Sequence, residues 1–144
     1  MNAIRYDSAV ISVGELIPEF RAQGVLVFFG EQAPPELHEF CILHRPSVAW
    51  SAPRAGDVVE LDGEPFTVTA VGHVVEQNLL QLGHLDLKAN GATQAPLPGD
   101  VCVEAKPLPE LAPGSRLRII AAGAAPAPAR TGAASTGSAT SEAS

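Results

Sequence analysis

Glycine and proline interrupt this chain so often that long helices are excluded. Residues 1–120 contain 10 Gly and 11 Pro, and a proline inside a helix removes a backbone hydrogen bond and clashes with the preceding turn. Short apolar and β-branched runs lie between these breaks. The runs that we predict as strands are 3–12, 24–29, 40–44, 57–61, 65–71, 85–89, 101–105 and 116–120. The sequence therefore predicts an all-β fold, a small barrel-like sandwich of seven or eight short strands.

Local signals refine this prediction. The dipeptide Asp62-Gly63 separates two of the strands, as in a tight hairpin. The run 24–29, G-V-L-V-F-F, is typical of a strand buried on both faces. One or two helical turns are expected after Pro34 and over 76–82, where Gly83 would end the second.

The end of the chain differs in composition from the rest. Residues 121–144 contain only Ala, Gly, Pro, Ser and Thr apart from Arg130 and Glu142. Such a segment has no large apolar side chain with which to build a core, so we expect a disordered tail. The fold then comprises one domain, residues 1–120, which carries the whole net charge of −7 because the tail's two charges cancel.

Charge and hydropathy exclude several classes of function. A net charge of −7 argues against a nucleic-acid-binding protein, which needs a basic face to meet phosphates. The longest apolar run, 25–29, is far shorter than the ~20 residues of a membrane span. The N-terminus lacks the apolar stretch of a signal peptide, so we expect a cytoplasmic protein. In that compartment Cys41 and Cys102 are interpreted as small buried hydrophobic residues rather than a disulfide or a zinc site.

Four histidines are the main candidates for chemistry. His44 closes the strand 40–44, which Pro46 should end, and His84 follows Gly83 immediately before another strand. Two histidines at strand ends could meet in a barrel, where an imidazole can attack phosphorus, accept a proton or bind a metal. From the residues alone, two interpretations of His44 and His84 remain open: a functional pair, or two histidines with structural roles only. His38 and His73 are expected to be exposed.

Cofactor and metal motifs are missing from the sequence. It contains no nucleotide-binding glycine loop, and its histidines and carboxylates lack the spacing of metal ligands. We therefore expect neither a cofactor nor a metal.

Three blocks of sequence resemble one protein family. The segment from Glu31 to His44 reads E-Q-A-P-P-E-L-H-E-F-C-I-L-H. Residues 67–87 contain T-V-T-A-V-G, V-E-Q-N-L and L-G-H-L-D-L, and residues 111–117 read L-A-P-G-S-R-L. In this order they are similar to the glucitol/sorbitol-specific IIA component of the phosphoenolpyruvate-dependent sugar phosphotransferase system. The resemblance covers about residues 3–120.

The resemblance implies a phosphotransferase component that carries a phosphoryl group. His44, which closes the F-C-x-x-H segment, would take this group from phospho-HPr and pass it to a cysteine of the IIB component. IIB would then phosphorylate a sugar alcohol at the IIC channel, so the membrane is involved only through the permease. We add the hypothesis that His84 donates a hydrogen bond to the phosphoryl oxygens, because it lies in the second block directly after Gly83.

Two other functions remain open. The first alternative is a regulatory or binding module that has the fold but no active relay, and the second is a metal-binding barrel. The sequence departs from the family at Pro46, where some relatives carry a histidine. Phe40, Leu43 and Trp50 are candidate docking contacts, although core positions are expected for Phe40 and Leu43. Neither the transported sugar nor the oligomeric state follows from the sequence.

Overall fold

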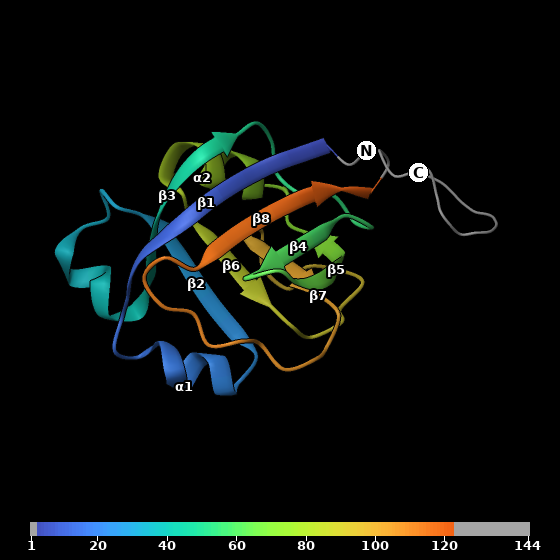
Figure 1. Cartoon of the computed structure of the whole chain (residues 1–144). Helices are drawn as coiled ribbons and strands as arrows, with labels where there is room; N and C mark the ends of the chain where they lie inside the picture. Colours follow the sequence, from blue (N-terminus) through green and yellow to red (C-terminus); the bar gives the residue numbers. More distant parts are fainter. Residues whose placement is uncertain (1–2, 123–144) are drawn as a thin grey trace, which may run out of the picture.

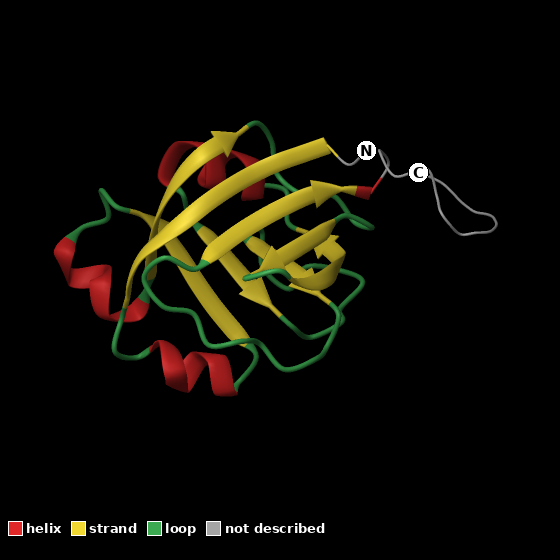
Figure 2. Ribbon diagram, in the orientation of Figure 1, coloured by secondary structure: helices red, strands yellow, loops and turns green. Residues whose placement is uncertain are grey.

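Eight strands close into a barrel in a computed structural model that describes residues 3–122 (Figure 1). Around the barrel the strands follow the order β1-β3-β2-β6-β7-β5-β4-β8. The helices lie outside it (Figure 2). The elements in chain order are β1 Ala3–Val13, α1 Ile17–Ala22, β2 Val25–Gly30, η1 Pro35–Phe40, β3 Ile42–Ala49, β4 Val58–Leu61, β5 Glu64–Val71, α2 Val75–Leu82, β6 Leu85–Lys88, β7 Asp100–Val103 and β8 Arg116–Ala121.

The predicted all-β barrel is confirmed, and each predicted strand has a counterpart. The last strand, β8, reaches Ala121, one residue beyond its predicted end. Apart from Ala121 and Ala122, the predicted tail 121–144 lies outside the described residues. The hairpin is also confirmed, because β4 and β5 pair antiparallel on either side of Asp62 and Gly63. Both turn residues have positive φ, 51° and 82°, as this kind of tight turn requires.

Most neighbouring strands are antiparallel, but β2–β3 and β6–β7 are parallel. Parallel neighbours need a crossover connection, and for β2 and β3 that connection contains η1. This pairing aligns Gly30, the last residue of β2, with His44 on β3. The chain that leaves β2 therefore starts beside His44.

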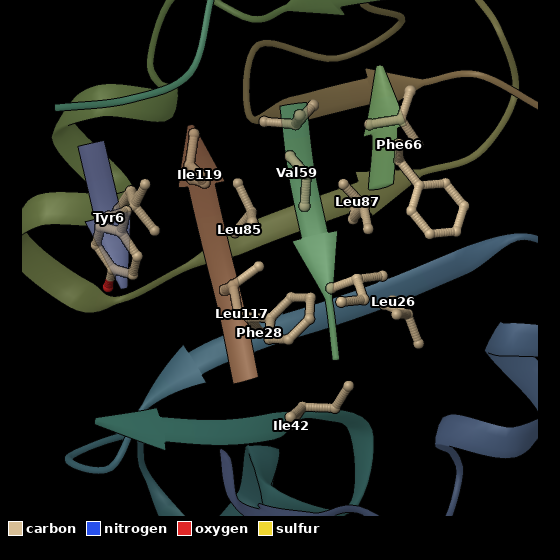
Figure 3. Close-up of a cluster of buried hydrophobic side chains, with 14 of the residues drawn as sticks. Tyr6, Leu26, Phe28, Ile42, Val59, Phe66, Leu85, Leu87, Leu117 and Ile119 are labelled. Carbon is tan, nitrogen blue, oxygen red and sulfur yellow. The ribbon is translucent and has the colours of Figure 1, made fainter. Parts of the chain in front are cut away.

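Side chains that alternate along the strands fill the barrel (Figure 3). On β2, for example, Leu26 and Phe28 are fully buried, whereas Val27 and Phe29 are half-buried against a second, outer cluster. The expected burial of both faces of this strand is therefore complete only on its inner face. The labelled core residues of Figure 3 are Tyr6, Leu26, Phe28, Ile42, Val59, Phe66, Leu85, Leu87, Leu117 and Ile119.

The largest error in the predicted strand boundaries concerns β3, which begins at Ile42 rather than at residue 40. β3 does not end at His44 but continues through Pro46 to Ala49. Proline is tolerated here because β2 has already ended at Gly30, so the strand has no neighbour on that side that needs its N–H. On the other side, Pro46 pairs with Ser8 at an irregularity in the register with β1.

Helix α1 is an element that the sequence pattern does not predict. Pro18 lies in its first turn, where the missing N–H costs nothing.

The expected core position of Phe40 is wrong: the side chain is 38% exposed and stacks on Phe20 of α1, with 6.5 Å between ring centres. Leu43 is buried, as expected, and Trp50 is 75% exposed.

We expect Asp57→Ala to destabilise the fold by about 3 kcal/mol, because it removes one partner of a buried ion pair. The buried carboxylate accepts hydrogen bonds from Arg5 Nε at 2.8 Å, from the Arg54 backbone N–H at 2.7 Å and from that of Ala122 at 3.0 Å. Urea unfolding measures the effect. Glu64→Ala, at an exposed position on β5, is the control and should change stability by less than about 0.5 kcal/mol. Equal effects of the two substitutions would contradict the role of Asp57.

Candidate functional site

His44 lies inside the barrel rather than on its surface. It occupies the same inward-facing side of β3 as Ile42, and its exposed fraction is 0%. Two aromatic rings pack around it: the centre of Phe28 is 5.8 Å from that of the imidazole, and the centre of Tyr6 is 6.0 Å away. The imidazole is therefore held in an apolar environment at the end of the core.

Two hydrogen bonds fix the orientation of this imidazole. Nε2 lies 2.7 Å from the backbone oxygen of Gly83, and Nδ1 lies 2.5 Å from Ser8 Oγ. A carbonyl oxygen can only accept, so Nε2 carries the proton in the neutral ring, and Nδ1 accepts from the Ser8 hydroxyl. Burial lowers the pKa of His44, although the hydrogen bond to Gly83 partly opposes this effect. The ring is therefore neutral near pH 7.

A cavity of 110 Å³ lies against His44. Gly83, which binds Nε2, is one of its lining residues, whereas Ser8, which binds Nδ1, is not. Of the two ring nitrogens, Nε2 is therefore the one that bonds a residue of the cavity wall. The cavity is lined by the end of β2 and the following loop, by β3, by Tyr6 and by the last turn of α2: Tyr6, Gly30, Glu31, Gln32, His44, Pro46, Ala49, Leu79, Leu80, Gln81 and Gly83.

Gly83 allows the end of α2 to approach both β2 and the imidazole. It ends α2 with a φ of 67°, a conformation that glycine adopts without steric cost. A Cβ atom at this position would lie 2.7 Å from the backbone nitrogen of Gly30 and 3.3 Å from His44 Nε2. The close packing at this point therefore requires glycine.

An ion pair lies beside the cavity on the outer surface. Arg45, next to His44, donates from Nε and from a terminal nitrogen to the two carboxylate oxygens of Glu31, at 2.8 and 2.7 Å. Both side chains are exposed, and the hydrogen bond from Arg45 lowers the pKa of Glu31. Glu31 lines the cavity, so the pair connects the loop after β2 to β3 across the site.

The sequence of this chain matches the model of one protein family. The model of the "PTS system glucitol/sorbitol-specific IIA component" matches residues 5–118. The chain belongs to this family. The resemblance of the three sequence blocks is thereby confirmed, and with it a place in a sugar-transporting phosphotransferase system.

Individual relatives agree with the family assignment. The chain is 36% identical to the glucitol/sorbitol-specific EIIA component of Shigella flexneri over 114 residues, which is 78% of this chain and 92% of the relative. The same component of Escherichia coli (strain K12) has the same identity and coverage. A PTS system IIA component from Enterococcus faecalis V583 has a similar crystal structure, with a TM-score of 0.67. Its identity is 19%, over 77% of this chain and 96% of that one, and it supports the fold alone.

The other three histidines do not join His44 in this family member. His84 follows Gly83, but its Nε2 lies 3.2 Å from Asp86 Oδ1 and its ring stacks on Phe29, with 4.7 Å between centres. It is not among the residues that line the cavity. His73 is exposed, as expected, whereas His38 is half-buried because its Nε2 bonds the backbone oxygen of Ala33.

Sequence reasoning missed Ser8 and Tyr6, which contact or adjoin His44. Residues 6, 8 and 10 alternate along β1, and all three are buried on the inner side. A serine between a tyrosine and a valine on one apolar face was the available signal, since a buried hydroxyl needs a partner. The identity of that partner depends on the pairing of β1 with β3.

Both cysteines are free and buried, as the sequence predicts. Among residues 3–122, three or more His, Cys, Asp or Glu side chains nowhere gather in an arrangement that could hold a metal ion. In the same part of the chain, every helix is too short or too polar to cross a membrane.

The pKa of His44 predicts a pH dependence of stability. In the unfolded chain His44 has its ordinary pKa near 6.5, so below that pH the unfolded state binds a proton that the folded state does not. The contribution of this group to stability is therefore complete above about pH 6.5 and is lost as the pH falls toward the lower folded value. We expect urea unfolding between about pH 7.5 and 5 to show a steeper loss in the wild type than in His44→Gln. Parallel curves would contradict this prediction.

Proposed function

We propose that this chain is a phosphocarrier that accepts a phosphoryl group on His44 from phospho-HPr and passes it to a cysteine of the IIB component. One observation carries the proposal: a neutral, oriented imidazole at the wall of a cavity, at the position that closes the F-C-x-x-H segment. A neutral imidazole is nucleophilic, and phosphoryl transfer demands mainly positioning and charge stabilisation from the protein.

The attacking atom in this proposal is Nε2. In the closed structure the Nε2 proton and the Gly83 carbonyl oxygen, 2.7 Å away, occupy the direction from which phosphorus must approach, so both must leave first. When the cavity opens, water takes the proton from Nε2 and supplies one to Nδ1. Ser8 Oγ can then accept a hydrogen bond from Nδ1, because a hydroxyl both donates and accepts. The Nε2 lone pair then forms the bond to phosphorus while the bond from phosphorus to the donor breaks, with its electron pair going to the donor. Ser8 thus holds the ring in both tautomers and keeps Nε2 directed toward the cavity wall.

Transfer requires the cavity to open, because His44 is fully buried. The cover on one side is the loop after β2, where Glu31 and Gln32 are exposed and the ion pair to Arg45 ties the loop to β3. Exposed ion pairs contribute little to stability, so this cover can separate at low cost. When it does, Arg45 becomes available to the incoming phosphoryl group.

Docking surfaces for the donor and acceptor would surround this opening. Leu80 lines the cavity and is 41% exposed, and Trp50 follows Ala49, another lining residue, with 75% of its surface exposed. Apolar contacts with a charged rim suit transient complexes, and the net charge of −7 favours encounters with a basic partner. We propose a cytoplasmic carrier that meets the membrane only through the IIB and IIC permease components.

We propose a role for His84 that is separate from that of His44. Its ring is 25% exposed and lies outside the cavity, so it would hydrogen-bond the phosphoryl oxygens only during transfer, after leaving Asp86. This role concerns the rate of transfer and not the site of phosphorylation.

A specific observation favours the second candidate, a binding or regulatory module without the relay. Both nitrogens of His44 have hydrogen-bond partners and the ring is inaccessible, as expected of a structural histidine. Incubation of the protein with phosphoenolpyruvate, enzyme I and HPr separates the two functions. A carrier takes up phosphate that is labile in acid and stable in base. If the wild type takes up none with HPr from the same cell, the relay is rejected and the module is favoured.

A further inference from the structure

Tyr6 carries a buried hydroxyl group that has no hydrogen-bond partner among residues 3–122. The residue is the only tyrosine of the sequence, lies on β1 and has an exposed fraction of 0%. Buried polar groups in folded proteins are nearly always paired, so an unpaired one calls for an explanation. A phenylalanine would fill the same space without this cost.

The position of Tyr6 suggests what the hydroxyl is for. Tyr6 lines the cavity that holds His44, and its ring centre lies 6.0 Å from the imidazole. Figure 3 shows Tyr6 at one end of the buried cluster, with its oxygen at the tip of the side chain. The residue that carries the unpaired donor and the imidazole of His44 therefore line the same cavity.

We propose that Tyr6 is a catalytic residue of the phosphoryl transfer, whose Oη donates a hydrogen bond to an oxygen of the phosphoryl group on His44. The inference rests on the proposed carrier function. It adds a group that stabilises the negative charge on the phosphoryl oxygens. Tyr6 keeps its proton throughout, so bonds form and break only at phosphorus as described above.

The chemistry of the cavity requires such a donor. Gly83 presents a carbonyl oxygen to Nε2 at the C-terminal end of α2, an end that carries partial negative charge and disfavours an anion. Burial raises the pKa of Tyr6 to about 12, so the hydroxyl stays protonated and can donate near pH 7. A phosphoryl oxygen offers the missing acceptor, and a donor placed in advance is how sites stabilise such charge.

Tyr6→Phe tests the proposal by removing only the oxygen. We expect phosphorylation of His44 to slow about 10- to 100-fold, the effect of losing one hydrogen bond to a charged group, while the midpoint of urea unfolding stays equal or rises. The rate is measured with phospho-HPr and with phosphoramidate, a small donor that needs no docking surface. The same slowing with both donors places the effect at the cavity, as proposed. Slowing with phospho-HPr alone would overturn the proposal in favour of a docking role.

Thr69→Val is the matched control, because it also removes a single hydroxyl. Thr69 lies on β5, which does not adjoin β1 or β3 in the barrel, and its Oγ1 donates a hydrogen bond to the backbone oxygen of Ala92. We expect this variant to be phosphorylated at the wild-type rate. If the wild type is labelled and Tyr6→Phe is labelled just as fast, the role of Tyr6 is overturned but the carrier function is not. A wild type that takes up no label overturns the carrier function itself.

A second measurement does not depend on the folding of any variant at Tyr6. Because Tyr6 is the only tyrosine, protein made with tyrosine labelled at the ring carbon that bears the hydroxyl gives one NMR signal for this group. We expect that signal to move when the wild type is phosphorylated and to stay in place in His44→Gln treated identically. An unchanged signal in phosphorylated wild type would overturn the proposal.

Discussion

We expect His44→Ala to take up no acid-labile phosphate when it is incubated with phosphoenolpyruvate, enzyme I and HPr, and the wild type to be labelled under the same conditions. This is the largest effect that we expect, because the substitution removes the nitrogen that would bond to phosphorus. The other histidines do not line the cavity, since His84 bonds Asp86, His38 bonds Ala33, and His73 is exposed elsewhere.

The burial of His44 makes controls necessary. The substitution leaves a small cavity and removes the partner of Ser8 and of Gly83, at a cost of about 1–3 kcal/mol. His44→Gln fills more of the space, and both variants are compared with the wild type by circular dichroism and urea unfolding. His73→Ala, at an exposed position, should keep full labelling. Label that persists on folded His44→Ala would place the acceptor on another residue.

The same assay measures the contribution of His84. We expect His84→Gln to be labelled more slowly than the wild type but to the same extent, because the ring acts from outside the cavity. A wild-type rate, with equally fast transfer to IIB, would remove His84 from the mechanism and leave His44 unaffected.

Gly83→Ala is expected to damage both the fold and the phosphoryl transfer. The new Cβ would meet the Gly30 backbone at 2.7 Å and His44 Nε2 at 3.3 Å, so either α2 or the end of β2 must shift. Crowding of this kind costs about 1–3 kcal/mol. Because the carbonyl of Gly83 orients the imidazole, labelling should also slow about 10- to 100-fold.

Gly63→Ala separates this crowding from the cost of the backbone conformation. Gly63 also has a positive φ, 82°, but a Cβ there would have no neighbour within 4 Å. Gly63→Ala should therefore lose only about 1 kcal/mol of stability, the cost of placing alanine in this backbone conformation. It should be labelled at the wild-type rate. If the two variants lose equal stability and both keep the wild-type rate, the close approach of α2 to Gly30 and His44 has no functional importance.

The sequence by itself determined the strands and one turn. Glycine and proline set the strand lengths, and Asp62-Gly63 set the β4–β5 hairpin, because these are preferences of the local backbone. Local preference also caused the error at Pro46. This proline was predicted to end its strand, but the effect of a proline depends on whether a neighbour needs its N–H, and only the assembled barrel shows this.

The sequence also singled out His44, through the resemblance of the segment that it closes. Only the tertiary structure decided what surrounds it. Ser8, Tyr6 and Gly83 are 36, 38 and 39 residues away along the chain, and they reach His44 because β1 pairs with β3 and α2 ends beside β2. Burial, the lowered pKa and the tautomer of His44 follow from those long-range contacts, which no local pattern encodes.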